Sequence, residues 1–363
     1  MIRFEQRTPP LAVEIAAPIV AAVVAAVLTP LVLAALGYPI GSAFAAMASG
    51  AFGSAMGFAQ IFALSAVLML TGLATLLSFS VRLNNLGAEG QLLAGALTVV
   101  VLGTLMSRVP GPLVIMLATL TGPLIGALMM AVPATMKAKL GTDETMVTLL
   151  LNVVALTGIA GATGTALTAI APAGVLQTFT LPATLPSAGI GIATRLGIGL
   201  VIAFFVCGAA HVINGYTVTG FMLRAIGGNP IAARFAGVPV DEIQFTIAAL
   251  SGGLAGFAGA ALALGFIGGA PAEISAGLGY GGIAVALLAG RWPGGIVPAA
   301  LFLAALIVGT QSLSRTAGAP VALGDIAIAL TLLTAPIASA LTRFRVRVVT
   351  ARPNAGAPSA GAS

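Results

Sequence analysis

Long apolar segments and short polar connections alternate along the chain. The first apolar segment covers residues 13–36, and the later ones begin near Phe58, Gly90, Leu113, Thr145, Leu196, Ile243, Gly279, Ile296 and Ile326. A helix needs about 20 apolar residues to cross the hydrocarbon core of a bilayer, and most of these segments reach that length. The pattern predicts an all-α, polytopic membrane protein with about ten transmembrane helices.

The eighth predicted span, at residues 279–290, is shorter than the others and rich in glycine. A broken or re-entrant helix is tolerated at membrane depth only where protein or a water-filled path covers its backbone. The pattern therefore leaves two structures open for this segment, a short span and a re-entrant helix.

Composition agrees with a membrane location. Hydrophobic residues make up 59% of the chain and charged residues only 7%, and the mean hydropathy is +1.13. Soluble domains carry roughly 25% charged residues. The 47 glycines and the aromatic content of 6% predict helices that pack closely through small residues. The alternating ten-residue pattern of a membrane β-barrel is absent from the sequence.

The positive charges predict an orientation. With both termini placed in the cytoplasm, the alternation of spans puts 12 of the 15 Lys and Arg residues on the cytoplasmic side, and Arg108, Arg195 and Arg315 outside. Cytoplasmic loops of membrane proteins carry such an excess. The net charge of +6 comes mainly from arginines scattered singly at span ends, so it indicates membrane orientation and no nucleic-acid partner.

Few residues of the chain are suited to catalysis or metal binding. The only cysteine, Cys207, and the only histidine, His211, lack the neighbouring Cys, His or carboxylate residues of a metal site. We expect Cys207 to be a small buried hydrophobe and His211 to have a structural or interfacial role. The only lysines, Lys137 and Lys139, do not follow a glycine-rich phosphate-binding loop. We therefore expect no catalytic residue, no metal and no cofactor on this chain.

One polar island, residues 215–238, interrupts the apolar pattern. In this island Asn229 can cap the N-terminus of a helix, Pro230 suits the first turn, and Gly237 can adopt the left-handed conformation that ends it. The island thus predicts a short capped helix at residues 231–236.

Two arginines, Arg224 and Arg234, lie close to this helix and would keep it at the membrane surface. Two interpretations stay open. The helix is either a docking element that passes movement from a soluble partner into the bundle, or part of a solvated loop anchored by its arginines.

Three polar residues, Asn85, Glu89 and Gln91, stand at the start of the predicted third span, in residues 83–97. An acidic residue at the centre of a spanning helix costs roughly 2.5–3.5 kcal/mol, so it usually faces a cavity, a partner or the interface. Glu89 therefore either contributes to a solute pathway or lies in the interface, where it caps a helix or pairs with Arg82.

Further polar residues fall in the fifth and eighth predicted spans. Asp143 and Glu144 favour the start of the fifth span, because carboxylates stabilise the positive end of a helix dipole. Asn152 within that span either forms hydrogen bonds between helices or contacts a solute. Tyr280 lies among glycines and either touches a solute or packs in the core.

Four stretches of the chain, taken together and in this order, resemble a known family: NLGAEGQLLAGAL, GTDETMVTLLLN, GFMLRAIGGNPIAARFAGV and GLGYGGIAVALLAGRWPGGIV. The family is that of the membrane permeases of ABC importers of the simple-sugar and nucleoside branch. With the apolar segments between them, the stretches cover most of residues 58–341. NLGAEGQ resembles the nucleoside-type permeases more than the ribose-type or branched-chain-amino-acid-type ones, although Leu86 stands where the family usually has isoleucine.

The resemblance implies a permease domain at residues 1–341, followed by a basic, disordered cytoplasmic tail at residues 342–363. It implies a multi-pass protein of the bacterial inner membrane that translocates nucleosides or related simple sugars. The implied partners are a second related permease, ABC ATPase subunits that hydrolyse the ATP, and a periplasmic or lipid-anchored substrate-binding protein.

The resemblance assigns expected roles to two groups of residues, one for coupling to the ATPase and one for the substrate pathway. Residues 214–242 match the cytoplasmic coupling loop, whose candidate ATPase contacts are Arg224, Asn229, Pro230, Arg234 and Gly237. The candidates for the substrate pathway are Asn85, Glu89, Gln91, Asn152 and Tyr280.

A stand-alone, proton-coupled carrier of small polar solutes is the alternative, with Glu89 as the titrating group. The scarcity of other acidic residues in the predicted spans argues against it. A membrane enzyme would need a polar cluster that the sequence does not contain.

Overall fold

The protein is a helical bundle. The computed structural model describes residues 2–6, 11–35, 37, 39–106, 109–161, 198–265, 277–290, 292–317 and 323–348. Its elements in chain order are β1 (Ile2–Gln6), α1 (Leu11–Ala35), α2 (Ile40–Phe52), α3 (Ala55–Ser80), α4 (Ala88–Leu105), α5 (Gly111–Leu140), α6 (Glu144–Gly161), α7 (Ile198–Tyr216), α8 (Val218–Gly228), α9 (Pro230–Phe235), α10 (Val240–Gly265), α11 (Leu278–Ala289), the 3₁₀ turn η4 (Pro293–Gly295), α12 (Ile296–Ala317), α13 (Leu323–Arg343) and β2 (Phe344–Val348).

Each predicted span contains a helix: the predicted segments fall on α1, on α3 to α7 and on α10 to α13. Within the described ranges, 5 segments are long and apolar enough to cross a membrane, namely Ala55–Ser80, Leu113–Leu140, Gly199–Tyr216, Val240–Leu264 and Pro293–Thr316. The remaining predicted spans contain shorter apolar helices. The structure confirms the helical class, with 5 helices long and apolar enough to cross a membrane among the described residues, and the larger number of spans stays a prediction.

Two helices lie between the predicted spans and were not expected. α2 has 13 residues and α8 has 11, fewer than the length of a membrane span. Their apolar residues are interrupted by glycine, serine, threonine or arginine. A pattern search based on spanning length therefore treats both segments as connections.

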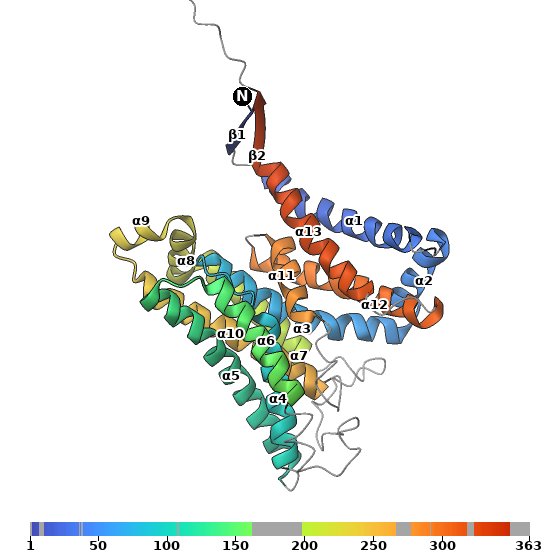
Figure 1. Cartoon of the computed structure of the whole chain (residues 1–363), viewed down its shortest axis with the longest axis horizontal. Coiled ribbons are helices and arrows are strands. Elements are labelled where there is room, and N and C mark those ends of the chain that lie inside the picture. The colour runs from blue at the N-terminus through green and yellow to red at the C-terminus, as the bar shows by residue number, and fades with distance from the viewer. Residues whose placement is uncertain are drawn as a thin grey trace, which may run out of the picture.

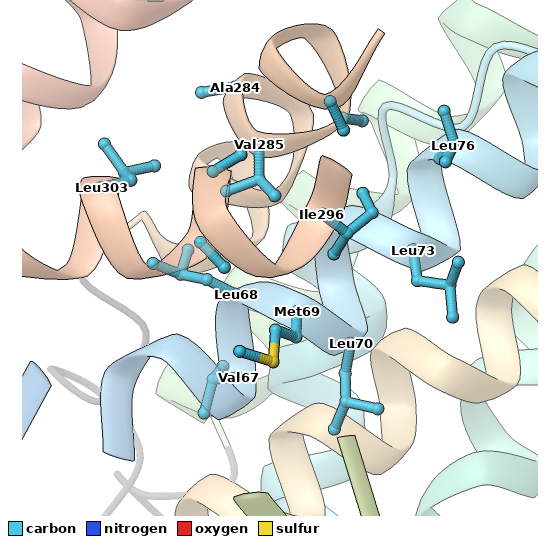
Figure 2. Close-up of a cluster of buried hydrophobic side chains, with 14 of the residues drawn as sticks. Val67, Leu68, Met69, Leu70, Leu73, Leu76, Ala284, Val285, Ile296 and Leu303 are labelled. Carbon is cyan, nitrogen blue, oxygen red and sulfur yellow. The ribbon is translucent and has the colours of Figure 1, made fainter. Parts of the chain in front are cut away.

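The centre of the bundle is α3, which contacts α7, α10, α11 and α12. Figure 2 shows Leu68, Met69 and Leu73 of α3 packed near Val285 of α11 and Ile296 of α12. Because lipid tails are as apolar as these side chains, close packing rather than removal from water favours the association of the helices.

Glycines bring α10 into close contact with α4 and α5. A Cβ atom added to Gly256 of α10 would lie 2.3 Å from the carbonyl oxygen of Gly122 in α5, and one added to Gly95 of α4 would lie 2.0 Å from the carbonyl oxygen of Gly256. Gly126 and Gly252 approach each other in the same way. Backbones this close leave no room for a side chain, which confirms the predicted packing through small residues.

The outer layer on one side of the bundle consists of α1 and α13, which lie along each other and over α11 and α12 (Figure 1). Beyond them, β1 pairs with β2 in an antiparallel ribbon that places Phe4 opposite Val346. The two ends of the described chain therefore lie together. α13 and β2 occupy residues 342–348 of the predicted tail, and residues 349–363 lie outside the described residues.

The glycine contacts predict the effect of a single methyl group. Gly256→Ala would place a Cβ atom 2.3 Å from the Gly122 oxygen and 3.0 Å from Gly126 Cα, so α10 must move away from α5. We expect the midpoint of thermal unfolding in detergent to fall by several degrees, because overpacking typically costs about 1–3 kcal/mol.

The matched control is Gly208→Ala in α7, where an added Cβ meets no atom within 4 Å. This variant should unfold at the wild-type temperature or slightly above it. If Gly256→Ala unfolded like Gly208→Ala, the close packing of α5 and α10 would be wrong.

Candidate functional site

The link between α3 and α4 carries a fully buried polar side chain, Asn85. Its amide nitrogen donates to Gln91 Oε1 at 3.0 Å and to Ser251 Oγ of α10 at 2.9 Å. Its oxygen accepts from Gln91 Nε2 at 3.1 Å and from the Gly87 N–H at 3.0 Å. Asn85 thus uses both of its donors and both of its acceptor positions, so none of its side-chain polar atoms is left unsatisfied inside the bundle.

Asn152 of α6 joins three other parts of the bundle. Its oxygen accepts from the Gly90 N–H of α4 at 2.9 Å, and its nitrogen donates to the Leu86 carbonyl at 2.9 Å. The same nitrogen lies 3.3 Å from the Tyr280 hydroxyl of α11. These bonds favour the interhelical role of Asn152 over a free side chain that waits for a solute.

Glu89 lies in the first turn of α4 and is only 3% exposed. Its Oε2 atom accepts from the backbone N–H of Gly279, the second residue of α11, at 2.7 Å. Gly277, which precedes α11, provides no side-chain cap. Glu89 therefore supplies one of the acceptors that the first turn of any helix needs.

Arg82, the alternative partner considered for Glu89, is engaged at the end of α8. Its Nε and Nη2 atoms donate to the carbonyls of Gly227 and Gly228 at 3.0 and 2.7 Å. Those carbonyls end a helix and attract a cation. Arg82 has a φ of 58°, a left-handed conformation that costs about 1–2 kcal/mol, and the bonds to α8 offset this cost.

The predicted pathway residues thus meet around the starts of α4 and α11. Asn85, Gln91, Glu89 and Asn152 are buried, and Tyr280 is half-buried at the edge of the group. We name this group the polar junction; its members are Asn85, Glu89, Gln91, Asn152, Tyr280 and Ser251. Sequence reasoning missed Ser251, because a single serine in an apolar helix has no distinguishing pattern.

A second polar group lies near the ends of α3 and α5 and the start of α6. Lys137 Nζ donates to Glu144 Oε1 at 2.7 Å and to the Arg82 carbonyl at 3.2 Å. The backbone N–H of Asn84 donates to the same Glu144 oxygen at 3.1 Å. With Arg82 bound to α8, the connections that follow α3, α5 and α8 lie on one face of the bundle, which the alternation of spans predicts.

The start of α6 agrees with the sequence. Asp143 Oδ1 accepts from the Thr145 N–H at 2.8 Å, and α6 begins at Glu144. Hydrogen bonds from the Thr145 side chain and backbone hold the pKa of the exposed Asp143 carboxyl below its usual value. The predicted role of the acidic pair in opening this helix is confirmed.

The predicted short helix in the polar island is α9, which runs Pro230–Phe235, and its capping is confirmed. Asn229 Oδ1 accepts from the N–H groups of Ile231 and Ala232 at 3.0 and 3.2 Å, and Pro230 occupies the first turn. Gly237 follows the helix with a φ of 84°, in the left-handed region. α8 and α9 together project from one end of the bundle (Figure 1).

The surface of α9 combines apolar and charged side chains. Phe235 is 89% exposed and Ile231 is 67% exposed, and Arg224 of α8 is exposed too. Arg234 forms an ion pair with Asp241 at 2.5 Å in which both side chains are mostly exposed. A capped helix that holds an exposed phenylalanine next to Arg234 favours a docking element over a solvated loop.

His211 and Cys207 lie in α7, away from the polar junction. The His211 ring packs beside Trp292, with ring centroids 6.4 Å apart, and Cys207 is buried. In the part of the chain that the structure describes, no three His, Cys, Asp or Glu side chains group as metal ligands would. Arg291, beside Trp292, lies outside the described residues.

A bundle of apolar helices with a buried polar junction and an exposed, capped helix α9 is compatible with a membrane transport component. Residues 57–336 match the family described as branched-chain amino acid transport system / permease component. The match covers most of the chain, which therefore belongs to this family of transporter permease components.

Characterised relatives cover most of the chain as well. The guanosine ABC transporter permease protein NupP of Bacillus subtilis is 32% identical over 82% of this chain and 86% of its own length. The nucleoside ABC transporter permease protein NupB of Lactococcus lactis is 28% identical over 73% of this chain and 75% of its own. The glucose ABC transporter permease protein TsgB13 of Haloferax volcanii is 30% identical over 84% of this chain and 83% of its own length.

The polar junction predicts a stability effect for Asn152→Ala. The variant leaves the Gly90 N–H and the Leu86 carbonyl without their side-chain partner. Each buried group left unsatisfied costs about 1–3 kcal/mol, so we expect a clear fall in the thermal midpoint in detergent. Thr157→Ala on the exposed side of α6 is the control and should leave the midpoint unchanged. Equal midpoints for the two variants would show that Asn152 does not join the helices.

Proposed function

We propose that this chain is the permease subunit of an ABC importer that carries nucleosides or related simple sugars across the inner membrane of a bacterium. The observation that carries the proposal is the capped helix α9, which exposes Phe235, Ile231 and Arg234 on the surface. The named activities of the relatives, guanosine, nucleoside and glucose ABC transport, support the same function.

The proposed topology has ten spans, with both termini and α8–α9 in the cytoplasm. Support comes from the positive charges at the ends of the helices, since Arg82 follows α3 and Lys137 and Lys139 lie in the last turn of α5. Hydrogen bonds of Arg82 and Lys137 hold these helix ends on one face. The pairing of β1 with β2 is consistent with termini on the same side of the membrane.

The proposed partners are a second related permease, ABC ATPase subunits and a periplasmic or lipid-anchored substrate-binding protein. ATP is hydrolysed by the ATPase subunits, and this chain holds no cofactor and no catalytic residue. The candidate ATPase contacts are Arg224, Asn229, Pro230, Arg234 and Gly237. Among them Asn229, Pro230 and Gly237 shape α9, and the two arginines present charge to the partner.

The proposed mechanism follows the hydrogen bonds from α9 into the bundle. Closure of the ATPase subunits around ATP moves α9, and α8 moves with it. Arg82, which holds the last carbonyls of α8, passes this movement to the link that carries Asn85 and to the start of α4. ATP can shift the pathway between outward and inward openings only through contacts that differ between the two states.

Uptake by the purified complex tests the function. An affinity tag on this chain should recover the ATPase and the second permease from the native membrane, and proteoliposomes with the binding protein should accumulate labelled guanosine or glucose only when ATP is enclosed on the ATPase side. Accumulation driven by a proton gradient, with this chain alone and no ATPase, would instead identify a stand-alone carrier.

The docking helix predicts the effect of a charge reversal. Arg234→Glu places a carboxylate beside Asp241 on the docking surface, and we expect ATP-driven uptake to fall by about tenfold or more, since truncated arginine anchors often cost 2 kcal/mol or more at interfaces. Arg315→Glu, the same change at an exposed site predicted on the opposite face, should leave uptake unchanged. Normal uptake by Arg234→Glu would remove the docking role from this residue.

A further inference from the structure

α11 by itself covers only part of the thickness of a bilayer. Its 12 residues rise about 18 Å at 1.5 Å per residue, whereas the hydrocarbon core is about 30 Å thick. Exposed Trp292 follows its C-terminal end, and tryptophan rings favour the membrane interface. The N-terminal end of α11 therefore lies within the depth of the membrane, where water cannot satisfy its free N–H groups.

The start of α11 meets the start of α4 at Glu89. The carboxylate accepts from the Gly279 N–H at 2.7 Å, and Glu89 itself belongs to the first turn of α4. One carboxylate thus lies at the positive ends of two helices. The contact requires glycine on α11, because a Cβ atom on Gly279 would lie 2.4 Å from the Glu89 backbone nitrogen.

Helices that begin inside a membrane are frequent anion sites. In transporters with broken helices, the half-helix N-termini point at negatively charged groups of the substrate. In this protein Glu89 takes that position. The neighbouring Tyr280 is half-buried and bonded to Asn152, so a solute beside Tyr280 meets a hydroxyl group and a helix end that already holds a carboxylate.

We propose that Glu89 fills the anion-binding position at the start of α11 and thereby sets the pathway for an uncharged solute rather than for one that carries a carboxylate. This inference rests on the proposed importer function and narrows its substrate class. It separates the guanosine and glucose named for the relatives from the amino acids named in the family description, because every amino acid carries a carboxylate.

The occupied helix end can be tested on the purified chain alone, in detergent. Glu89→Ala removes the acceptor of the Gly279 N–H, and we expect the thermal midpoint to fall by about 3–6 °C. Sodium formate at about 50 mM should restore at least half of the loss, since a free carboxylate can occupy the vacated helix end. Sodium chloride at equal ionic strength should restore none of it.

Two further variants separate the charge from the fold. Glu89→Gln keeps an acceptor oxygen without the charge, so it should lose less stability and should not respond to formate. Glu242→Ala removes an exposed acid from the first turn of α10, where a carboxylate contributes about 0.3–1 kcal/mol, so it should lose less stability than Glu89→Ala and should not respond to formate. The proposal is overturned if Glu89→Ala is as stable as wild type, or if formate stabilises it no more than chloride does.

The substrate class is tested in the complete importer. Unlabelled uncharged nucleosides or sugars should compete for ATP-driven uptake. Leucine in about 1000-fold excess should not compete, which means that the importer binds leucine more than about 4 kcal/mol less favourably than its solute. Competition by leucine, or its accumulation, would overturn the proposal. If the wild-type complex took up no solute with ATP, the importer function itself would fall, and the formate experiment would still decide whether Glu89 fills the helix end.

Discussion

Polar groups at membrane depth must find partners inside the protein, and the polar junction satisfies this constraint for two helices that begin within the bundle. α4 and α11 both start without a side-chain cap from the preceding residue. Asn152 bonds the Gly90 N–H of α4, and Glu89 bonds the Gly279 N–H of α11. Neither start could lie at this depth without these side chains, so the relative position of α4, α6 and α11 depends on them.

The same part of the chain connects the polar junction with the docking surface. Arg82 holds the end of α8, and three residues later Asn85 enters the junction. Gln244 of α10 donates to the Val81 carbonyl at 2.8 Å and fixes the end of α3 from another side. A movement of α9 therefore reaches the starts of α4 and α11 through a few residues, while the glycine contacts of α10 with α4 and α5 keep the surrounding helices together.

Much of the fold could be predicted, because span length and the apolar pattern report directly on membrane helices. The cap of α9 could be predicted too, since Asn229, Pro230 and Gly237 each favour one local conformation. The polar junction was foreseen only as a set of residues. Its pairing of Glu89 with Gly279 joins positions 190 residues apart, and no local rule reports such a contact. The hydrogen bonds from Arg82 to the end of α8 could not be predicted for the same reason. The left-handed backbone of Arg82 was also unexpected, because that conformation favours glycine.

The side of the membrane that α9 faces decides whether an ATPase can drive the junction. Phe235 is 89% exposed, so a cysteine in its place should be accessible to a labelling reagent. The native Cys207 is only 1% exposed, so its background labelling should be low. In intact cells that produce this chain without its ATPase partner, a membrane-impermeant maleimide should leave position 235 unlabelled, and permeabilisation of the membrane should make it react. Labelling of position 235 in intact, unpermeabilised cells would place α9 outside and contradict ATP-driven transport through this helix.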